Sequence, residues 1–406
     1  LTGWKIKIPV LIGGATTSKA HTALKIEPNY KTGLATHVLD ASRSVGVVQK
    51  LLNRETNKNY IKEIRKDYIS TRERLENKYA KPLLSLEEAN KNKPKINWGK
   101  NKPKKPSFLG NKKIENIPIK TLRNYIDWTP FFKSWDLAGS YPKILKDSIV
   151  GEAASQLFKE ANLMLDQLEK SQVITNQAVI GFWPASQTKN NQIQVFKDEQ
   201  RKEVEVNLSF PRQQGYQGKE RPNLSLSDFI APHSSDVKDY IGAFAVTAGI
   251  GVEETCNKYE NNNDDYSSIM LKALADRLAE SLAEYIHEKV RKELWGYSKN
   301  ENLQTQELIK EKYIGIRPAP GYPACPDHSE KVKLFSLLEV EKNTGISLTE
   351  NFAMLPAASI SGWYFSHPES KYFGLGRISL KQIERISIDK DEEIHLTKKY
   401  LSTNLE

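Results

Sequence analysis

The residues best suited to chemistry lie in a proline-rich stretch near residue 320. Residues 317–326 read Arg-Pro-Ala-Pro-Gly-Tyr-Pro-Ala-Cys-Pro. Prolines fix the backbone and remove N–H donors, so we expect a rigid, turning loop. An arginine held in such a loop is ready for bidentate contact with a carboxylate. A ligand-binding loop and a purely structural connection are both compatible with this composition.

The same stretch ends near Cys325 and His328, whose spacing raises the question of a metal site or a catalytic cysteine. The only other cysteine in the chain is Cys256, and a free cysteine is usually a buried apolar residue. We therefore expect no catalytic residue and no metal site here. Two cysteines also cannot form a disulfide framework, and they suit a reducing, cytoplasmic environment.

Acidic residues at helical spacing form a second candidate site. One face of a long helix expected over residues 265–295 carries Asp276, Glu280, Glu284 and His287. Such a stripe is usually solvated. If it faced a pocket, its carboxylates could bind an amine or a sulfonium cation. No second acid is visibly paired with it, so general acid–base chemistry is not indicated.

Two turns of small residues near the N-terminus form a third candidate. Gly13-Gly14 follows an apolar run over residues 7–12, and Ala41-Ser42 follows the next expected strand over residues 37–39. In parallel sheets, ligands bind at the carboxyl ends of the strands, where glycine allows close approach to the backbone. The simpler interpretation of each is a tight strand-to-helix turn.

The elements that would position these residues predict a multi-domain fold, α/β followed by α+β. Residues 5–53 alternate strand and helix, as at the end of a doubly wound, parallel (Rossmann-like) α/β domain. Residues 107–406 cluster their strands and helices, which favours an α+β region with a mainly antiparallel sheet and long helices. We expect its helices at 151–170, 265–295 and 332–342, its strands at 179–182, 193–196 and 204–210, and a strand pair near the C-terminus. The longest nearly apolar run, residues 240–252, is too short to span a bilayer, so we expect no membrane partner.

Most of the net charge lies in one segment. The chain of 406 residues carries Lys+Arg 60 and Asp+Glu 50, a net charge of +10. Residues 91–113 hold nine lysines and no acid, so 10 − 9 leaves about +1 for the remainder. We interpret residues 54–106 as a charged helix and a solvated, extended Lys/Pro-rich linker. The alternative is a basic nucleic-acid-binding module, although only Trp98 and Phe108 could stack on bases there.

Several ordered motifs resemble cobalamin-dependent methionine synthase, and the resemblance covers essentially the whole chain. The matching residues are 12–22 (Ile-Gly-Gly-Ala-Thr-Thr-Ser-Lys-Ala-His-Thr), 125–132 (Tyr-Ile-Asp-Trp-Thr-Pro-Phe-Phe), 275–280 (Ala-Asp-Arg-Leu-Ala-Glu), 317–326, and 361–368 (Ser-Gly-Trp-Tyr-Phe-Ser-His-Pro). The resemblance implies that residues 1–53 end a cobalamin-binding domain. Residues 107–406 would then form an activation domain that binds S-adenosylmethionine.

The resemblance also implies an activity. Enzymes of this family are methyltransferases that pass a methyl group from methyltetrahydrofolate to cobalamin and then to homocysteine. When oxidation strands the cofactor as cob(II)alamin, the activation domain supports reductive methylation. A flavodoxin-like or methionine synthase reductase-type protein supplies the electron, and S-adenosylmethionine supplies the methyl group. A role limited to docking that electron donor remains a third interpretation.

Site residues follow from the resemblance position by position. The expected S-adenosylmethionine-binding residues are Asp127, Glu280, Arg317, Ala319, Gly321, Tyr322, Tyr372 and Phe373. Arg317 would hold the methionine carboxylate, while the two acids would take the amine or the ribose side. The expected cobalamin-binding residues are Gly13, Gly14, Ala41 and Ser42. Asp276 and Glu254 would meet the cobalamin domain when the two domains close.

The chain also departs from the family pattern. It opens Leu-Thr-Gly-Trp, without an initiator Met, and lacks the Asp-x-His-x-x-Gly motif of the lower axial histidine. We therefore expect a piece of a longer protein, with that motif upstream of Leu1. His21, on the helix after the Gly-Gly turn, is not expected to replace it. The zinc site belongs to the homocysteine module, which this sequence does not contain, so the fragment alone should not make methionine and should bind cobalamin only in part.

Overall fold

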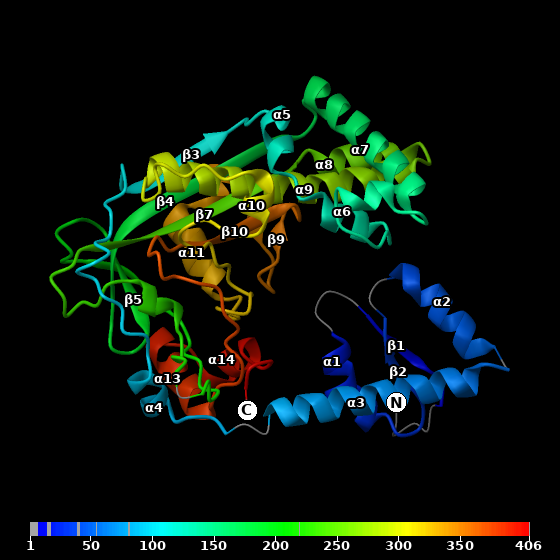
Figure 1. The fold of residues 1–406 in the computed structure, drawn as a ribbon, viewed down its shortest axis with the longest axis horizontal. Coiled ribbons are helices and arrows are strands. Elements are labelled where there is room, and N and C mark those ends of the chain that lie inside the picture. The colour runs from blue at the N-terminus through cyan, green and yellow to red at the C-terminus, as the bar shows by residue number, and fades with distance from the viewer. Residues whose placement is uncertain are drawn as a thin grey trace. The chain divides into compact units, whose positions relative to one another are not determined.

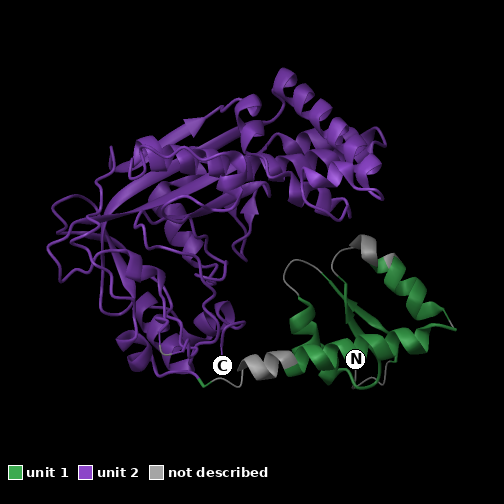
Figure 2. Cartoon of the chain, in the orientation of Figure 1, with its two compact units in different colours: residues 1–82 green, residues 83–406 purple. Residues whose placement is uncertain are grey.

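The chain forms two compact units, residues 1–82 and residues 83–406 (Figure 2). The computed structural model describes residues 7–13, 18–38, 41–53, 55–79, 82–218 and 220–405; for residues 41–43, 45 and 74–79 it describes the backbone only. Among these residues, none of the helices combines the length and the apolar character that a membrane span requires.

Unit 1, residues 1–82, contains two short parallel strands (Figure 1). Strand β1 (Val10–Ile12) pairs with β2 (Ala35–His37), so that Ile12 lies opposite His37. The connection between them contains α1 (Lys19–His21), η2 (Thr22–Ile26) and η3 (Glu27–Asn29), and β2 is followed by α2 (Ala41–Leu52) and α3 (Asn57–Tyr79). Parallel strands joined through a helical crossover agree with the predicted strand–helix alternation. A wider doubly wound sheet stays a prediction.

Helix α3 is more closely packed than its charged sequence indicates. The sequence predicts a charged helix, yet Tyr68 is only 2% exposed. Its hydroxyl oxygen accepts a hydrogen bond of 2.6 Å from the backbone N–H of His37 in β2. Tyr68 therefore ties α3 to β2 within unit 1.

Unit 2, residues 83–406, is built on an antiparallel sheet, as the sequence predicted. Within the described residues the sheet has six strands in the order β10-β7-β4-β5-β6, with β3 also paired to β4. The strands are β3 (Gly110–Glu115), β4 (Thr175–Gln187), β5 (Gln192–Phe196), β6 (Val204–Ser209), β7 (Asp239–Ile250) and β10 (Ser359–Tyr364).

The central strands β4 and β7 are buried on both faces. Along β4, Ile180 and Phe182 belong to one hydrophobic cluster, while Val179 and Trp183 belong to another. Alternate side chains of a strand point to opposite faces. A strand covered on both faces can be apolar throughout, which explains the nearly apolar run over residues 240–252, most of which lies in β7 (Asp239–Ile250).

Helices cover both faces of this sheet, and the longest is α9 (Asp265–Lys289), which packs against β7 (Figure 1). Leu274, Leu278 and Leu282, spaced by four, are at most 1% exposed, as the helical spacing predicted. The other helices between residues 119 and 344 are α5 (Ile119–Leu122), η4 (Arg123–Tyr125), α6 (Trp128–Ser134), η5 (Lys143–Lys146), α7 (Gly151–Ser171), η6 (Leu226–Phe229), α8 (Val252–Asn261), η7 (Val290–Leu294), α10 (Thr305–Ile309), α11 (Glu330–Leu338) and α12 (Val340–Thr344).

The lysine-rich segment differs from the extended linker that we expected. Its first lysine, Lys91, ends α4 (Leu86–Lys91), a helix that Ser85 caps. Farther on, the indole N–H of Trp295 donates a 2.8 Å hydrogen bond to the carbonyl oxygen of Lys104, and β3 joins the sheet. The segment is thus ordered within unit 2 by these backbone hydrogen bonds and by two of its lysines: Nζ of Lys104 donates to the carbonyl oxygen of Gly296 at 2.5 Å, and Lys105 pairs with Glu199 at 3.0 Å.

The C-terminal region also differs in part from expectation. The expected strand pair is present as β8 (Ser347–Leu348) and β9 (Met354–Leu355), and β10 adds to the main sheet. Two further helices, α13 (Leu380–Lys390) and α14 (Ile394–Tyr400), follow. They enclose a small core of their own that includes Ile378, Ile383 and Leu401.

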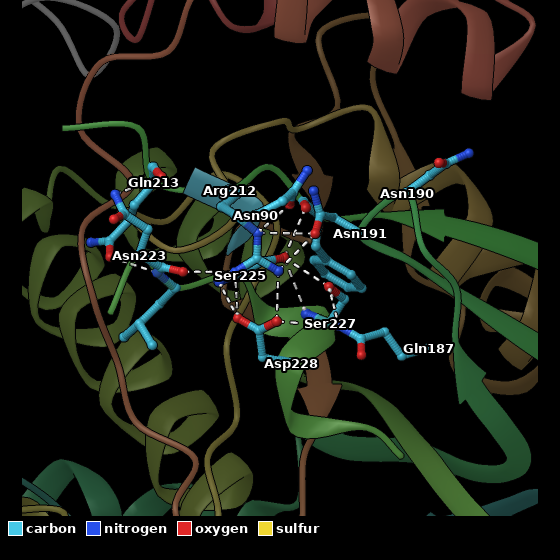
Figure 3. A network of polar contacts seen from close by, with 12 residues as sticks. Asn90, Gln187, Asn190, Asn191, Arg212, Gln213, Asn223, Ser225, Ser227 and Asp228 are labelled. Atoms are coloured by element: carbon cyan, nitrogen blue, oxygen red, sulfur yellow. Dashed lines mark hydrogen bonds and ion pairs between the residues drawn. The ribbon is translucent and has the colours of Figure 1, made fainter. Parts of the chain in front are cut away.

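A buried polar network connects α4 and α13 to the loop after β6, and Figure 3 shows its centre around Arg212 and Asp228. At its centre Arg212 pairs with Asp228, with side chains 0% and 2% exposed. The Arg212 guanidinium also donates to the side-chain oxygens of Asn90, in α4, and Asn191. The side chain of Gln382, in α13, bonds both the backbone N–H and the carbonyl oxygen of Arg212.

Candidate functional site

The proline-rich loop is attached to the end of β10. Ile316 and Phe365 exchange two backbone hydrogen bonds of 3.0 Å, and the N–H of Trp363 donates to the carbonyl oxygen of Pro318 at 2.9 Å. A Cβ on Gly362 would lie 2.8 Å from that same oxygen, so the strand needs glycine for this close approach. The loop therefore has a rigid base, as its prolines predicted.

Within the loop, short-range bonds close a turn over residues 319–325. The N–H of Gly321 donates to the carbonyl oxygen of Cys325 at 2.8 Å, and that of Tyr322 donates to Ala319 at 3.1 Å. Gly321 has φ +96°, a conformation that favours glycine. The Tyr322 side chain projects from this turn and is 62% exposed, so its ring is available for contact.

Arg317, at the start of the loop, lies against helix α9. Its guanidinium Nη2 lies 3.1 Å from Oε2 of Glu284, and its backbone N–H donates a 3.0 Å hydrogen bond to the hydroxyl oxygen of Tyr372. The Arg317 Nε is buried and has no hydrogen-bond partner among the described residues. Burial, the largest single influence, would lower the pKa of Arg317, but Glu284 together with Tyr313, Tyr372 and Glu280 outweighs it and raises the pKa. The arginine is firmly charged.

Glu284 itself lies between two arginines. Its other oxygen, Oε1, is 3.5 Å from Nη1 of Arg291, which in turn pairs with Glu301 at 2.7 Å. Arg291 belongs to η7, the π-helical turn after α9, and its guanidinium lies 4.2 Å from the ring centroid of Tyr313. A single line of alternating charges thus reaches the base of the loop.

The acidic stripe on α9 is not uniformly solvated. Asp276 is exposed and Glu280 is partly buried, whereas Glu284 and His287 are 8% and 0% exposed. Burial, followed by the charges of the two nearby arginines, lowers the pKa of His287 well below its ordinary value, so it is neutral. The stripe therefore runs from solvent into the protein, and its inner end meets Arg317.

Asp127 approaches α9 from a different element. It is the N-cap of α6, and its Oδ1 accepts a 3.0 Å hydrogen bond from the N–H of Thr129. Helix α6 and the preceding η4 both pack against α9. Tyr125 of η4 donates a 2.6 Å hydrogen bond to Oε2 of Glu288 on that helix. The structure therefore puts Asp127 on an element that contacts the helix of Glu280.

Of the two expected residues at positions 372 and 373, Tyr372 contacts Arg317 and Phe373 does not. Tyr372 is joined to the arginine through the backbone bond described above, while Phe373 packs against the hydrophobic cluster of the sheet face. The sequence reasoning gave Glu284 no role at the site. Glu284 follows Glu280 by one helical turn on the stripe already recognised, but nothing along the chain distinguishes it from the other acids of that face.

The Cys325 thiol has no features of a reactive group. Burial, with smaller contributions from Glu330 and Asp327, raises its pKa. Its Sγ donates to the carbonyl oxygen of Ala319 at 3.0 Å. No cluster of three or more metal-ligating side chains occurs among the residues that the structure describes. The thiol supports the turn of the loop, because a buried, protonated sulfur is a poor nucleophile.

In unit 1 the two small-residue turns follow neighbouring strands. Gly13 comes directly after β1, and a Cβ there would lie 3.2 Å from the carbonyl oxygen of Val38 after β2. Ala41 and Ser42 open α2; their side chains, like the whole of Gly14, lie outside the described residues. His21 is exposed on α1. The two turns thus lie at the carboxyl ends of adjacent parallel strands, the usual place for a ligand.

Comparison with known proteins adds two findings. The family model "Vitamin B12 dependent methionine synthase, activation domain" matches residues 118–391. The chain is also similar to a solved structure described as "Crystal Structure of the MetH Reactivation Domain bound to AdoHcy". The TM-score is 0.78 and the sequence identity 49%, and the match covers 80% of this chain and 99% of that one. Neither finding supports the nucleic-acid interpretation.

Proposed function

Because the chain belongs to the family defined by the activation domain of vitamin B12-dependent methionine synthase, we propose that unit 2 binds S-adenosylmethionine for reductive methylation of oxidised cobalamin. This reaction returns an inactivated methyltransferase to its working state. The similar solved structure contains AdoHcy, the demethylated form of that ligand. The family and the bound molecule together support this function.

The observation that carries the proposal is the placement of Arg317. A proline-rich loop holds it against α9, and part of its side chain, 18%, stays exposed. The Nη1 atom has no hydrogen-bond partner among the described residues, so it is a free, charged donor for the methionine carboxylate. On the same helix, Glu280 offers a carboxylate that would attract the ligand's ammonium or sulfonium cation.

The remaining expected residues take supporting roles in this proposal. Asp127 uses one oxygen as a helix cap, which leaves the other for the amine or the ribose. Tyr322 offers an exposed ring, and the turn at Ala319 and Gly321 offers backbone groups. Tyr372 and Phe373 would form a further contact strip. All these residues orient the ligand and exclude water; none of them needs to transfer a proton.

Unit 1 would contribute to the cobalamin site. Gly13, Gly14, Ala41 and Ser42 would line the nucleotide tail, consistent with two turns at the ends of adjacent strands. Bound cobalamin supplies the cobalt that accepts the methyl group. Asp276 and Glu254, both exposed, would contact the cobalamin domain on closure. A flavodoxin-like or reductase-type protein would supply the electron.

Calorimetric titration of the full chain with S-adenosylmethionine tests the proposal. Replacing Arg317 by alanine removes a charge-assisted contact worth about 1.5–3 kcal/mol, so affinity should fall about 10- to 100-fold. The matched control is Arg385→Ala, which removes an arginine that is 45% exposed and pairs with Asp389 on α13. Binding should survive in the control.

Absence of binding by the wild type would refute the function and favour a role limited to docking the electron donor. Undiminished binding by the Arg317→Ala variant would refute the site instead. The two failures are therefore distinguishable, because the first concerns the ligand and the second concerns its place on the protein.

A further inference from the structure

Four side chains of alternating charge form a line from the interior of unit 2 to the loop. In order they are Glu301, Arg291, Glu284 and Arg317, with side chains 6%, 0%, 11% and 18% exposed. Their charges sum to zero, as buried charges must nearly do. The inner pair is more deeply buried than the outer pair, so the line has an anchored end and an accessible end.

The inner end is rigid. The Nε of Arg291 lies 2.8 Å from Oε2 of Glu301, and its Nη2 lies 2.7 Å from Oε1 of the same residue. This two-point contact fixes the plane of the guanidinium. Tyr313 packs on that plane, with its ring centroid 4.2 Å away. Arg291 is thereby a fixed point for the carboxylate of Glu284.

Glu284, held by Arg291, in turn holds Arg317 in place. It gives one oxygen to each arginine, Oε1 to Arg291 and Oε2 to Arg317. Among the described residues, Arg317 has no other carboxylate within ion-pair distance. An arginine side chain free in solution carries about 2 kcal/mol of rotamer entropy. Holding it in place before the ligand arrives avoids that cost during binding.

We infer that Glu284 is a positioning residue that aims Arg317 at the carboxylate of the bound ligand. The inference rests on the proposed function. Glu284 does not itself contact the ligand; its effect passes through the arginine. It follows that Glu284 matters only for ligands that have a carboxylate for Arg317 to hold.

If Glu284 acted only through its negative charge, ligands with and without a carboxylate would lose affinity in the opposite order. Replacing Glu284 by glutamine removes a negative charge near a cationic ligand, which weakens attraction of the sulfonium and the ammonium. For S-adenosylmethionine, a freer Arg317 would partly offset this by attracting the carboxylate more strongly. Decarboxylated S-adenosylmethionine has both cations and no carboxylate, so a charge-only role predicts that it loses more affinity.

The experiment measures the affinities of both ligands for the full-length wild type and for Glu284→Gln. Positioning predicts that S-adenosylmethionine binds about three- to tenfold more weakly to the variant, while the decarboxylated ligand changes by less than about twofold. In an Arg317→Ala background, the Glu284→Gln change should have no further effect on S-adenosylmethionine, because the arginine it would aim is gone.

The matched control is Glu260→Gln. Glu260, in α8, pairs at 2.9 Å with Lys272 of α9, and that lysine lies 12 positions, or about 18 Å along the axis of α9, from Glu284. The Glu260→Gln variant should bind both ligands with unchanged affinity. Retained binding of the decarboxylated ligand by Glu284→Gln also shows that the variant is folded.

Equal weakening of both ligands, or greater weakening of the decarboxylated one, would overturn the inference. If Glu284→Gln binds neither ligand, the same two affinities are measured for Glu284→Asp. This variant keeps the negative charge but shortens the side chain by one methylene, which moves the carboxylate away from Arg317. A loss confined to S-adenosylmethionine then supports positioning, and an equal loss excludes it. A wild type that binds neither ligand would refute the proposed function rather than this inference.

Discussion

The buried pair of Arg212 and Asp228 makes a sharp stability prediction. The carboxylate of Asp228 accepts four hydrogen bonds, from Nη1 and Nη2 of Arg212 at 2.8 and 2.6 Å, from the N–H of Ser225 at 2.8 Å and from the amide of Gln187 at 3.2 Å. Changing Asp228 to asparagine turns one accepting oxygen into an NH₂ group that faces other donors. It also leaves the Arg212 charge buried without its counter-ion.

The expected loss follows from this geometry. Because the pair is 0% and 2% exposed, solvent cannot screen or replace the missing charge, and breaking such a pair costs about 3–5 kcal/mol. In a unit of this size that corresponds to a fall in melting temperature of about 5–10 °C. The matched control is Asp166→Asn, which breaks an Asp–Arg pair of 2.7 Å whose acid is 51% exposed. It should cost at most about 1 kcal/mol.

Thermal and urea unfolding followed by tryptophan fluorescence measures the effect in unit 2. Of the seven tryptophans, only Trp4 lies in unit 1, so the signal reports mainly on the unit that contains the pair. A loss of no more than about 1 kcal/mol for Asp228→Asn, equal to that of the control, would refute the reasoning that this buried network holds α4 and α13 in place.

Two further changes test the loop and a buried acid. Gly321→Ala should lower the stability of unit 2 by about 1–3 kcal/mol and weaken S-adenosylmethionine binding. The reason is that φ of Gly321 is +96° and the added Cβ would lie 2.1 Å from the His328 ring. The control is Gly345→Ala, where φ is +71° and the Cβ would meet open space, so the same unfolding and titration assays measure the cost of the backbone conformation alone. Burial raises the pKa of Asp239 from 3.8 to about 7 against two backbone N–H donors, so the folded state prefers the protonated form. The free energy of unfolding of the wild type, relative to Asp239→Asn, should therefore fall as pH rises from about 4 to about 7, by up to about 1.4 kcal/mol for each pKa unit, and then level off; urea unfolding across pH measures it, and a flat difference would contradict it.

The local elements were largely readable from the sequence, because each depends on neighbours along the chain. The leucines of α9 repeat every four residues, so that helix was predicted with its buried face. The lysine-rich segment shows the limit of such reasoning. Its composition indicates an extended linker, yet Lys104 accepts a hydrogen bond from Trp295 through its carbonyl oxygen. Composition describes side chains, and this contact belongs to the backbone.

Much of the site could also be anticipated. The rigid loop and the proposed role of Arg317 as a ligand of the carboxylate follow from residue type and from the resemblance of the motifs. Glu284 could not be selected in this way, because Asp276, Glu280 and Glu284 share one helical face and look equivalent along the chain. Their exposure differs only because the helix passes from solvent into the protein.

The sequence by itself therefore determined the rigid loop, the charged arginine and the acidic face of α9, since proline geometry, guanidinium chemistry and helical periodicity are local properties. Only the tertiary structure decided which acid meets the arginine. Arg317 and Glu284 are 33 positions apart, and they meet because β10 pairs with β7 while α9 packs against that same strand. Contacts between distant segments depend on how elements pack, and packing is a property of the whole fold.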